Sequence, residues 1–255
     1  MRHPFRRVAV LAAVVALGAC ATASAIVAEF GPVFVSATVS VQPRELPKRG
    51  YAPITLTSIT RVKTKDGSTP PTLKSIQFLI DKHGTVNAKA FPTCSPAKLE
   101  GTTTAQARQL CAGALVGKGT GKALVTMPGR VPFTMTSRVS FFNAPPTGGR
   151  PTLIAHSYET VPDAETLLVP IVVERVSRER YGYRVRVERP EIADGYGAPI
   201  LAEAKVGAVR KRGGKEVGYL AAQCSGGRLQ VDGTLKFTNG DSFPATLTSP
   251  CHWPR

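Results

Sequence analysis

The stretch from Tyr181 to Glu188 reads YGYRVRVE, and its alternation decides the fold class. Tyrosine and valine take one set of alternate positions, while Arg184, Arg186 and Glu188 take the other. Side chains of a β-strand point to opposite faces in turn, so a period of two is typical of a half-buried strand. The stretch therefore predicts a strand with one face toward a core and the other toward water.

The same kind of pattern repeats along the chain from Gly31 onward. Runs rich in Val, Ile, Thr, Phe and Tyr, each followed by a turn cluster, predict strands over residues 33–41, 54–62, 76–80, 114–127, 133–142, 152–158, 167–176, 181–187, 200–209, 216–222, 229–237 and 242–247. Asn239-Gly240 separates the last two runs and predicts a tight hairpin, because both residues tolerate positive φ. Short strands at this spacing predict an all-β fold, namely a single β-sandwich or a jelly-roll-like or barrel variant of one.

Composition agrees with this fold class. The chain has 255 residues, of which 42% are hydrophobic and 20% charged, with 24 glycines and 21 prolines. The hydrophobic share is enough for a packed core, and the glycine and proline content argues against coiled coils and helical bundles. No low-complexity linker and no internal repeat divides the sequence, so residues 31–255 are expected to form one domain. One short helix is predicted from Thr103 to Leu110, because Thr103 and Gln106 have capping-box spacing.

The first 25 residues have the pattern of a signal peptide. Three arginines precede an aliphatic run over residues 8–17, which is too short to span a membrane comfortably, and small residues follow it. Two processing routes fit. Either a general signal peptidase cuts after a small-x-small triplet at 21–23 or 23–25, or Leu17-Gly18-Ala19-Cys20 is a bacterial lipobox and Cys20 carries lipid. Both routes predict an extracellular or cell-surface protein, attached to a membrane only through a lipid anchor on Cys20.

Four cysteines remain once Cys20 is removed or acylated: Cys94, Cys111, Cys224 and Cys251. Four thiols in an exported chain predict two disulfides, for which three pairings exist. Sequence proximity favours Cys94 with Cys111 and Cys224 with Cys251. No pair has the two-to-four-residue spacing usual in zinc sites, and no two histidines have ligand spacing, so no metal site is predicted.

The chain is strongly basic. Its formal charge is +16, and removing the three leader arginines leaves 30 basic residues against 17 acidic ones, or +13. Basic residues concentrate over 175–189 and over 205–215. A cationic surface of this kind attracts an anionic envelope polymer or lipid surface. The alternative is an ordinary solvated face, in which interleaved glutamates weaken the field. Nucleic acid is not an expected partner, because export separates the protein from the chromosome.

Candidate catalytic side chains are few. His156 shares a predicted strand face with Ile154 and Tyr158, where a packed histidine is the alternative to a general base. Acidic residues form two loose groups that could supply a pair of carboxylates for glycoside hydrolysis, Glu159, Asp163 and Glu165 in one and Glu188, Glu191 and Asp194 in the other. The single tryptophan, Trp253, lies at the end of the chain and gives poor support to a sugar-stacking platform. No catalytic set and no cofactor site is predicted.

Two further spacings resemble known motifs but are better explained structurally. Residues 117–122 read GKGTGK, yet a phosphate loop requires Ser or Thr where this chain has Ala123. Glycine at every second position instead bares one face of a strand, which suits the close approach of another backbone. Ser95 and Lys98 have the serine–x–x–lysine spacing of penicillin-recognising enzymes without the companion motifs, and Ser95-Pro96 suits a helix start.

The chain resembles a group of exported, β-rich proteins of high-GC actinobacteria. The resemblance spans most of the expected mature chain and is carried by Leu46-Pro-Lys-Arg-Gly-Tyr-Ala-Pro53, Asp66-Gly-Ser-Thr-Pro-Pro-Thr-Leu73, Phe91-Pro-Thr-Cys94, Ala112-Gly-Ala-Leu-Val-Gly-Lys-Gly119, Phe142-Asn143, Gly149-Arg-Pro-Thr-Leu-Ile-Ala-His-Ser-Tyr158 and Tyr219-Leu-Ala-Ala-Gln-Cys224. It includes the four mature cysteines. The resemblance implies export and disulfide bonding, and it implies no activity and no functional residues, since none is assigned to that group.

These observations together predict an exported, disulfide-stabilised binding or structural protein of the cell envelope or extracellular space. The alternative is an extracellular hydrolase acting on envelope or polysaccharide material, whose carboxylates or His156 meet only in the folded chain. The two differ in one visible respect, because an enzyme of this kind requires its acidic side chains to face one another across a deep cleft.

Overall fold

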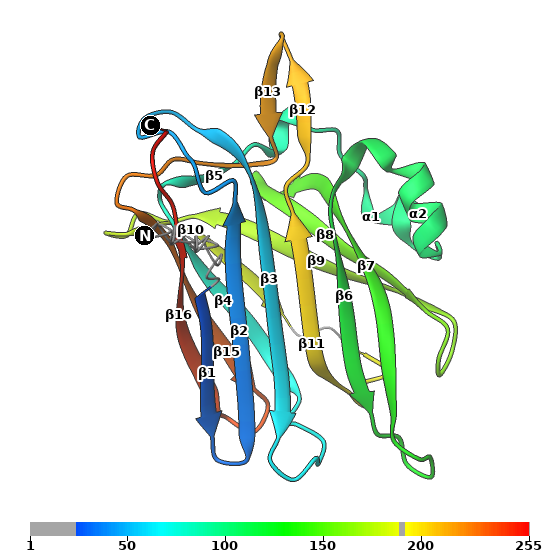
Figure 1. Ribbon diagram of the computed structural model, residues 1–255. Coiled ribbons are helices and arrows are strands. Elements are labelled where there is room, and N and C mark those ends of the chain that lie inside the picture. The colour runs from blue at the N-terminus through cyan, green and yellow to red at the C-terminus, as the bar shows by residue number, and fades with distance from the viewer. Residues whose placement is uncertain (1–23, 189–191, 255) are drawn as a thin grey trace, which may run out of the picture.

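The computed structural model describes residues 24–188 and 192–254 (Figure 1). The expected leader with Cys20, except for its last two residues, and the acidic candidate Glu191 lie outside these residues. The strands are β1 (Ser24–Phe30), β2 (Val33–Gln42), β3 (Ala52–Thr64), β4 (Leu73–Asp81), β5 (Gly84–Val86), β6 (Leu115–Val125), β7 (Phe133–Thr147), β8 (Arg150–Glu159), β9 (Glu165–Arg175), β10 (Tyr181–Glu188), β11 (Gly197–Val206), β12 (Val209–Arg212), β13 (Lys215–Gly218), β14 (Leu220–Ala222), β15 (Arg228–Phe237) and β16 (Ser242–Pro250). The helices are α1 (Pro96–Leu99) and α2 (Thr104–Leu110), with 3₁₀ turns at Ala88–Ala90 and Ala112–Ala114.

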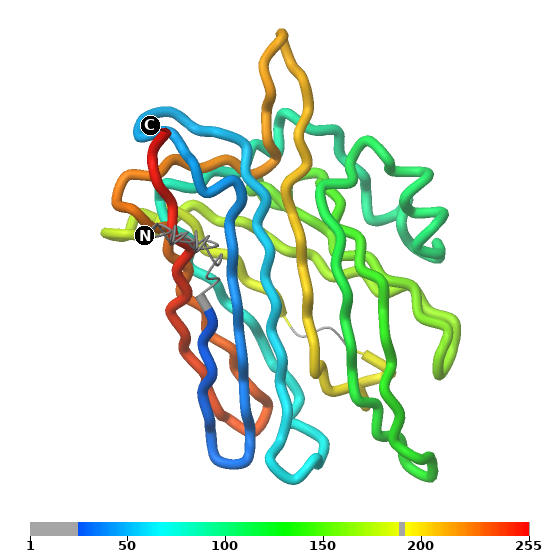
Figure 2. The backbone as a smooth tube through the Cα atoms, in the orientation of Figure 1, coloured from blue at the N-terminus to red at the C-terminus, as the bar shows by residue number. Residues whose placement is uncertain are grey.

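One antiparallel sheet forms the body of the protein. Its strand order is β1-β2-β3-β11-β6-β7-β8-β9-β10-β4-β15-β16, and the short β14 pairs with both β3 and β5. The sheet curls so far that its two edges meet, with Phe30 of β1 edge-to-face against Phe243 of β16 at 6.4 Å between ring centroids. The result is a nearly closed, two-layered β structure. Figure 2 shows the path of the backbone through it. The predicted all-β fold class is confirmed.

The predicted strands are present, with four differences, one of which is the short strand β5, which was not predicted. The predicted strand 200–209 is divided into β11 and β12, and 216–222 into β13 and β14, because Gly207 and Gly218 approach other backbone too closely for a side chain. The fourth difference is β1, which begins before the expected domain start at residue 31. β1 is an edge strand of the sheet, where Val27 is 69% exposed while Ile26 and Ala28 pack against the core.

Hydrophobic packing divides the interior into two parts. Where β2 and β3 face β15 and β16, the layers are in direct contact through Val35, Val62, Leu235 and Phe243. On the other side of the molecule the inner faces of β6 to β11 form a second core around the fully buried Tyr219. This second core fills only part of the space that the curled strands enclose.

Both predicted disulfides form. Cys224–Cys251 joins the residues just outside the β15–β16 hairpin, and Gly240 in the turn has a φ of +94°, as Asn239-Gly240 predicted. Cys94–Cys111 ties α1 and α2 to the outer face of β7 and β8. Two disulfides are typical of a protein that folds in an oxidising compartment.

The predicted helix is α2, and its capping box is complete. The Thr103 side chain accepts from the Gln106 backbone N–H, while the Gln106 side chain accepts from the Thr103 N–H. Ser95 precedes the one-turn helix α1 with Pro96 as its first residue, so the serine–x–x–lysine spacing belongs to a helix start beside a disulfide.

The glycines of β6 permit a close approach of β11, as the sequence predicts. A Cβ atom built on Gly119 would lie 2.0 Å from the carbonyl oxygen of Glu203, and one on Gly117 would lie 2.7 Å from that of Lys205. These residues pair within the sheet, so the run of glycines is a strand and not a phosphate-binding loop.

Candidate functional site

A cavity of about 230 Å³ lies inside the curled sheet, and we call it the inner cavity. The inner faces of β4 and β6 to β11 line it, and the walls are almost entirely apolar. Small ligands commonly bind in concave, mainly apolar sites that carry a few placed polar groups. The inner cavity is therefore the first candidate for a binding site.

Small side chains at inward positions explain why the cavity is left open. Neighbouring strands present Gly121, Ser137, Ala155 and Ala202 to it, whereas the filled half of the interior uses larger residues such as Leu153 and Val173. Antiparallel pairing places Gly121 beside both Ser137 and Ala202, so three small residues lie side by side across β7, β6 and β11.

Glu159 is the distinctive polar group of the inner cavity. It is the last residue of β8 and only 8% exposed, and its Oε1 atom has no hydrogen-bond partner among the described residues. Burying a carboxyl oxygen without a partner costs free energy, since the group loses its hydration. A ligand that donates a hydrogen bond or carries a positive charge would remove this cost.

A second hollow of about 260 Å³ adjoins the inner cavity, and we call it the mouth recess. The two share Met135, Glu159, Leu167 and Ile192 in their walls. The mouth recess also contains Asp163, Glu165 and Asp194, so the fold brings together members of both acidic groups seen in the sequence. The opening beside Glu159 is therefore acidic in a protein that is basic as a whole.

The chain bends sharply at this opening. Ala193 and Asp194 have positive φ values of +48° and +53°, a conformation that residues with a side chain adopt at a cost. The carbonyl oxygen of Ile192 accepts hydrogen bonds from the backbone N–H groups of Gly195 and Gly197, which hold the bend against the end of the sheet. Strained residues of this kind collect at ligand sites, where the surrounding structure keeps them in place.

His156 does not belong to this site. It alternates along β8 with Ala155 and Ser157, which line the inner cavity, so its ring points the opposite way, beneath α1 and α2. There it is fully buried, with Phe142 edge-to-face at 6.2 Å and Nε2 at 3.1 Å from the carbonyl oxygen of Thr102. Burial lowers the pKa of His156 because the charged ring would lose its hydration. Of the two alternatives left open by the sequence, the packed histidine is the one the geometry supports.

The two basic regions of the sequence behave differently. Several arginines of the first region pair with acids, since Arg184 contacts Glu174 at 2.8 Å and Arg180 contacts Asp81 at 3.4 Å. The second region forms the β12–β13 hairpin, which projects beyond the body of the sheet (Figure 1). Three of its basic side chains are exposed near the turn: Lys211, Arg212 and Lys215. We call these three residues the hairpin cations.

The described residues contain neither a metal-ligating cluster nor a membrane-spanning helix. No three His, Cys, Asp or Glu side chains there come together in a group that could hold a metal ion. Within residues 24–188 and 192–254, no helix is both long and apolar enough to cross a membrane.

Comparison of the chain with family models, with curated proteins and with solved structures returned no match.

Proposed function

We propose that this is an exported binding protein that takes an apolar molecule with a hydrogen-bond-donating or cationic group into the inner cavity. One observation carries the proposal, namely the nine-tenths buried, unpartnered Oε1 of Glu159 in the wall of an apolar cavity. The apolar part of the ligand would gain from leaving water, at about 25 cal/mol per Å² of buried surface. The carboxyl group of Glu159 would select the polar end.

Acidic surroundings favour a cation over an anion at this position. Asp163, Glu165 and Asp194 line the mouth recess next to Glu159, and like charges repel an approaching carboxylate or phosphate. We therefore expect long-chain amines to bind better than alcohols of the same length, and alcohols better than fatty acids.

The place of action we propose is the cell envelope or the extracellular space. The leader-like first 25 residues, the two disulfides and the resemblance to exported actinobacterial proteins support it. The hairpin cations support an anionic polymer or lipid surface as the partner, because they lie together on an exposed projection and attract negative charge. The proposal includes both routes of leader processing, with a lipid anchor on Cys20 or with Cys20 removed.

Displacement of the fluorescent probe N-phenyl-1-naphthylamine tests the cavity. Dodecylamine, dodecanol and dodecanoate are titrated against probe-loaded protein, and we expect apparent affinity to fall in that order. Ala202→Phe fills the inner cavity from an exposed inward position and should reduce probe binding at least tenfold. Ala105→Phe, on the exposed face of α2, adds the same ring elsewhere and should leave binding unchanged.

Glu159→Gln tests the choice of polar group. It keeps the shape of the side chain and removes the charge, so the preference for the amine over the alcohol should disappear while probe binding persists. Equal affinity for all three ligands in the unaltered protein would contradict the role of Glu159. Probe binding that Ala202→Phe leaves intact would contradict the cavity as the site.

Vesicle binding tests the partner. Retention on vesicles rich in anionic lipid, compared with neutral vesicles, should fall when the hairpin cations are changed to glutamine. The control changes three exposed lysines elsewhere, Lys74, Lys98 and Lys236, to glutamine and alters the net charge equally. An identical loss in both triple variants would show that net charge alone acts, and retention insensitive to salt would remove the electrostatic basis. The intact mass of protein from its native host reports cleavage and any acyl chains on Cys20.

A further inference from the structure

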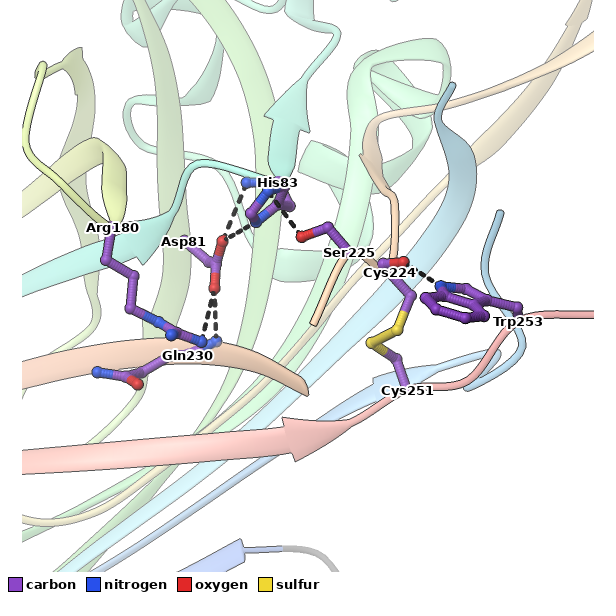
Figure 3. The surroundings of a disulfide bond; sticks show 8 residues. All are labelled: Asp81, His83, Arg180, Cys224, Ser225, Gln230, Cys251 and Trp253. Carbon is purple, nitrogen blue, oxygen red and sulfur yellow. Dashed lines mark hydrogen bonds and ion pairs between the residues drawn. A yellow bond between two sulfur atoms is a disulfide. The ribbon is translucent and has the colours of Figure 1, made fainter. Parts of the chain in front are cut away.

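Three side chains that no sequence motif connects meet at the end of β4 distant from the inner cavity. Asp81 ends β4, His83 follows in the turn before β5, and Ser225 comes from the loop between β14 and β15 (Figure 3). His83 Nδ1 lies 2.7 Å from Asp81 Oδ1, and His83 Nε2 lies 2.7 Å from Ser225 Oγ. No local pattern in the sequence marks these residues as a site, because Ser225 and His83 are 142 positions apart.

The carboxylate of this cluster is rigidly held. The Asp81 side chain is 3% exposed, and its Oδ1 also accepts from the His83 backbone N–H at 3.1 Å. Its Oδ2 accepts from the backbone N–H of Gln230 at 3.2 Å and faces the Arg180 guanidinium at 3.4 Å. A buried carboxylate with these partners is a fixed acceptor, and it orients the imidazole so that Nδ1–H donates to it. Nε2 is then the free acceptor, directed at the hydroxyl of Ser225.

The serine is held by covalent structure. Cys224 immediately precedes it, and the disulfide to Cys251 fixes that residue, as does a backbone hydrogen bond from Cys224 N–H to the Pro47 carbonyl at 2.9 Å. Trp253 donates its indole N–H to the carbonyl of Cys224 on the other side. Exposure increases along the cluster, from the buried Asp81 through His83 at 25% to the exposed Ser225. A substrate in solution can therefore reach the hydroxyl, while the carboxylate stays dry.

We propose that Ser225 is an acyl-accepting nucleophile, with His83 as its general base and Asp81 as the positioning residue, in the hydrolysis of carboxylic esters. Ser225 Oγ forms a bond to the ester carbonyl carbon, and its proton passes to His83 Nε2. The bond from that carbon to the alcohol oxygen breaks, and the proton on His83 goes to the departing alcohol. Water then adds to the acyl-serine with His83 again as base, releasing the carboxylic acid and restoring the serine hydroxyl.

The surroundings indicate which esters fit. Neither Ser225 nor His83 lines the inner cavity or the mouth recess, and the apolar hollow beside them, which Asp81, Gly84 and Gln230 help to line, measures only about 80 Å³. Gly226 and Gly227 follow the serine, and nothing lies within 4 Å of where a Cβ would project from either, which leaves open space for a bulky alcohol. The substrates indicated are short acyl esters, acetyl esters above all, of alcohols large enough to remain outside.

This site is independent of the proposed binding function. It shares no residue with the walls of the inner cavity, and Asp81 lies about 17 Å along β4 from Ile76, the nearest cavity residue on that strand. A protein that binds no apolar ligand could still cleave esters at Ser225, and the reverse also holds.

Covalent labelling is the decisive experiment. The whole protein is treated with a fluorophosphonate probe, which phosphonylates an activated serine and releases fluoride. The adduct is then located by peptide mass spectrometry. Hydrolysis of 4-nitrophenyl acetate is measured in parallel. We expect the adduct on Ser225, and we expect Ser225→Ala and His83→Gln each to lower both labelling and hydrolysis at least tenfold. Ser242→Ala and His252→Gln, changes at exposed residues of the same types, should alter neither.

Folding is checked separately, so that each outcome decides the question. Thermal unfolding and the count of free thiols should match the unaltered protein for Ser225→Ala and His83→Gln, since both side chains are at least partly exposed. Asp81→Asn, which removes charge from a buried residue, should slow labelling of Ser225, whereas Ser242→Ala should leave its rate unchanged. No label on Ser225, or labelling of Ser225 that His83→Gln leaves at full rate, would show that the three residues only stabilise the turn.

Discussion

Substituting alanine at Gly119 should destabilise the protein far more than the same substitution at Gly121, two residues along the same strand and on the same face. A Cβ on Gly119 would lie 2.0 Å from the Glu203 carbonyl oxygen and 3.1 Å from its carbon. Both obstacles are backbone atoms of β11, the strand paired with β6, so a rotamer change cannot relieve the contact. The two strands would have to separate.

The magnitude follows from what the strands would have to do. Overpacking costs roughly 1–3 kcal/mol where side chains can shift, and occasionally more, so with backbone as the obstacle we expect about 3 kcal/mol or more for Gly119→Ala. At Gly121 the nearest atom to an added Cβ is Ser137 Cβ at 3.8 Å, an ordinary contact. Gly121→Ala should therefore stabilise by about 0.4–1 kcal/mol, because alanine restricts the unfolded chain.

Urea unfolding followed by far-ultraviolet circular dichroism measures both changes. The urea midpoints of the two variants should shift in opposite directions, while the dependence of the unfolding free energy on urea concentration stays the same. In thermal unfolding, Gly119→Ala should lower the Tm by about 6–12 °C, at roughly 2–4 °C per kcal/mol. Neither glycine has a positive φ, so backbone strain does not contribute to the difference. Free energies of unfolding within about 0.5 kcal/mol of each other for the two variants would refute the close approach of β6 and β11.

Three further predictions concern the buried core and the disulfides. Replacing Cys224 and Cys251 together by serine should lower the free energy of unfolding by about 3–4 kcal/mol, from the 27-residue separation that the bond spans, and denaturant titration of the oxidised and double-serine proteins measures it. The contribution of His156 to the free energy of unfolding should be fully present above about pH 6.5 and should decrease as the pH falls below that value. The reason is that the pKa of His156 is lowered in the folded protein, so the unfolded chain binds a proton more readily than the folded chain does. The variant His156→Gln should lose that part of the pH dependence, and an unchanged profile would contradict the burial of His156. Asn143→Leu should destabilise by several kcal/mol in thermal unfolding, because the Asn143 amide donates to the backbone carbonyls of Phe91 and Pro92 at 3.2 and 2.9 Å, and leucine would take this donor from both. A loss below about 1 kcal/mol would count against this network.

Local patterns predicted most of the elements. Alternation identified β10, Asn239-Gly240 identified the last hairpin, and the spacing of Thr103 and Gln106 identified the start of α2. Each of these features depends on side chains within a few positions of one another, so the sequence carries the signal directly. β1 was missed because it begins inside the expected leader and ends before residue 31, where the domain was expected to start.

The candidate sites were less predictable. Two acidic groups about 30 positions apart were visible as Glu159 with its neighbours and Asp194 with its own, yet their meeting in one recess depends on how the sheet curls. Small residues at inward positions of β6 and β11 were also readable, but an empty space forms only if no opposing strand fills it. For the Ser225 cluster the one local signal was Asp81 and His83 two positions apart in a turn, a spacing common in ordinary turns.

The amino-acid sequence alone determined an all-β chain with two disulfides in the favoured pairing, because strand alternation and cysteine proximity are short-range properties. Only the tertiary structure decided that the sheet nearly closes, that Glu159 is buried without a partner in an apolar cavity, and that His83 lies between Asp81 and Ser225. Those outcomes depend on strand order, curl and register, which bring together side chains far apart in the chain. The physical reason is that a strand's own residues specify which face is inward but not which other face it will meet.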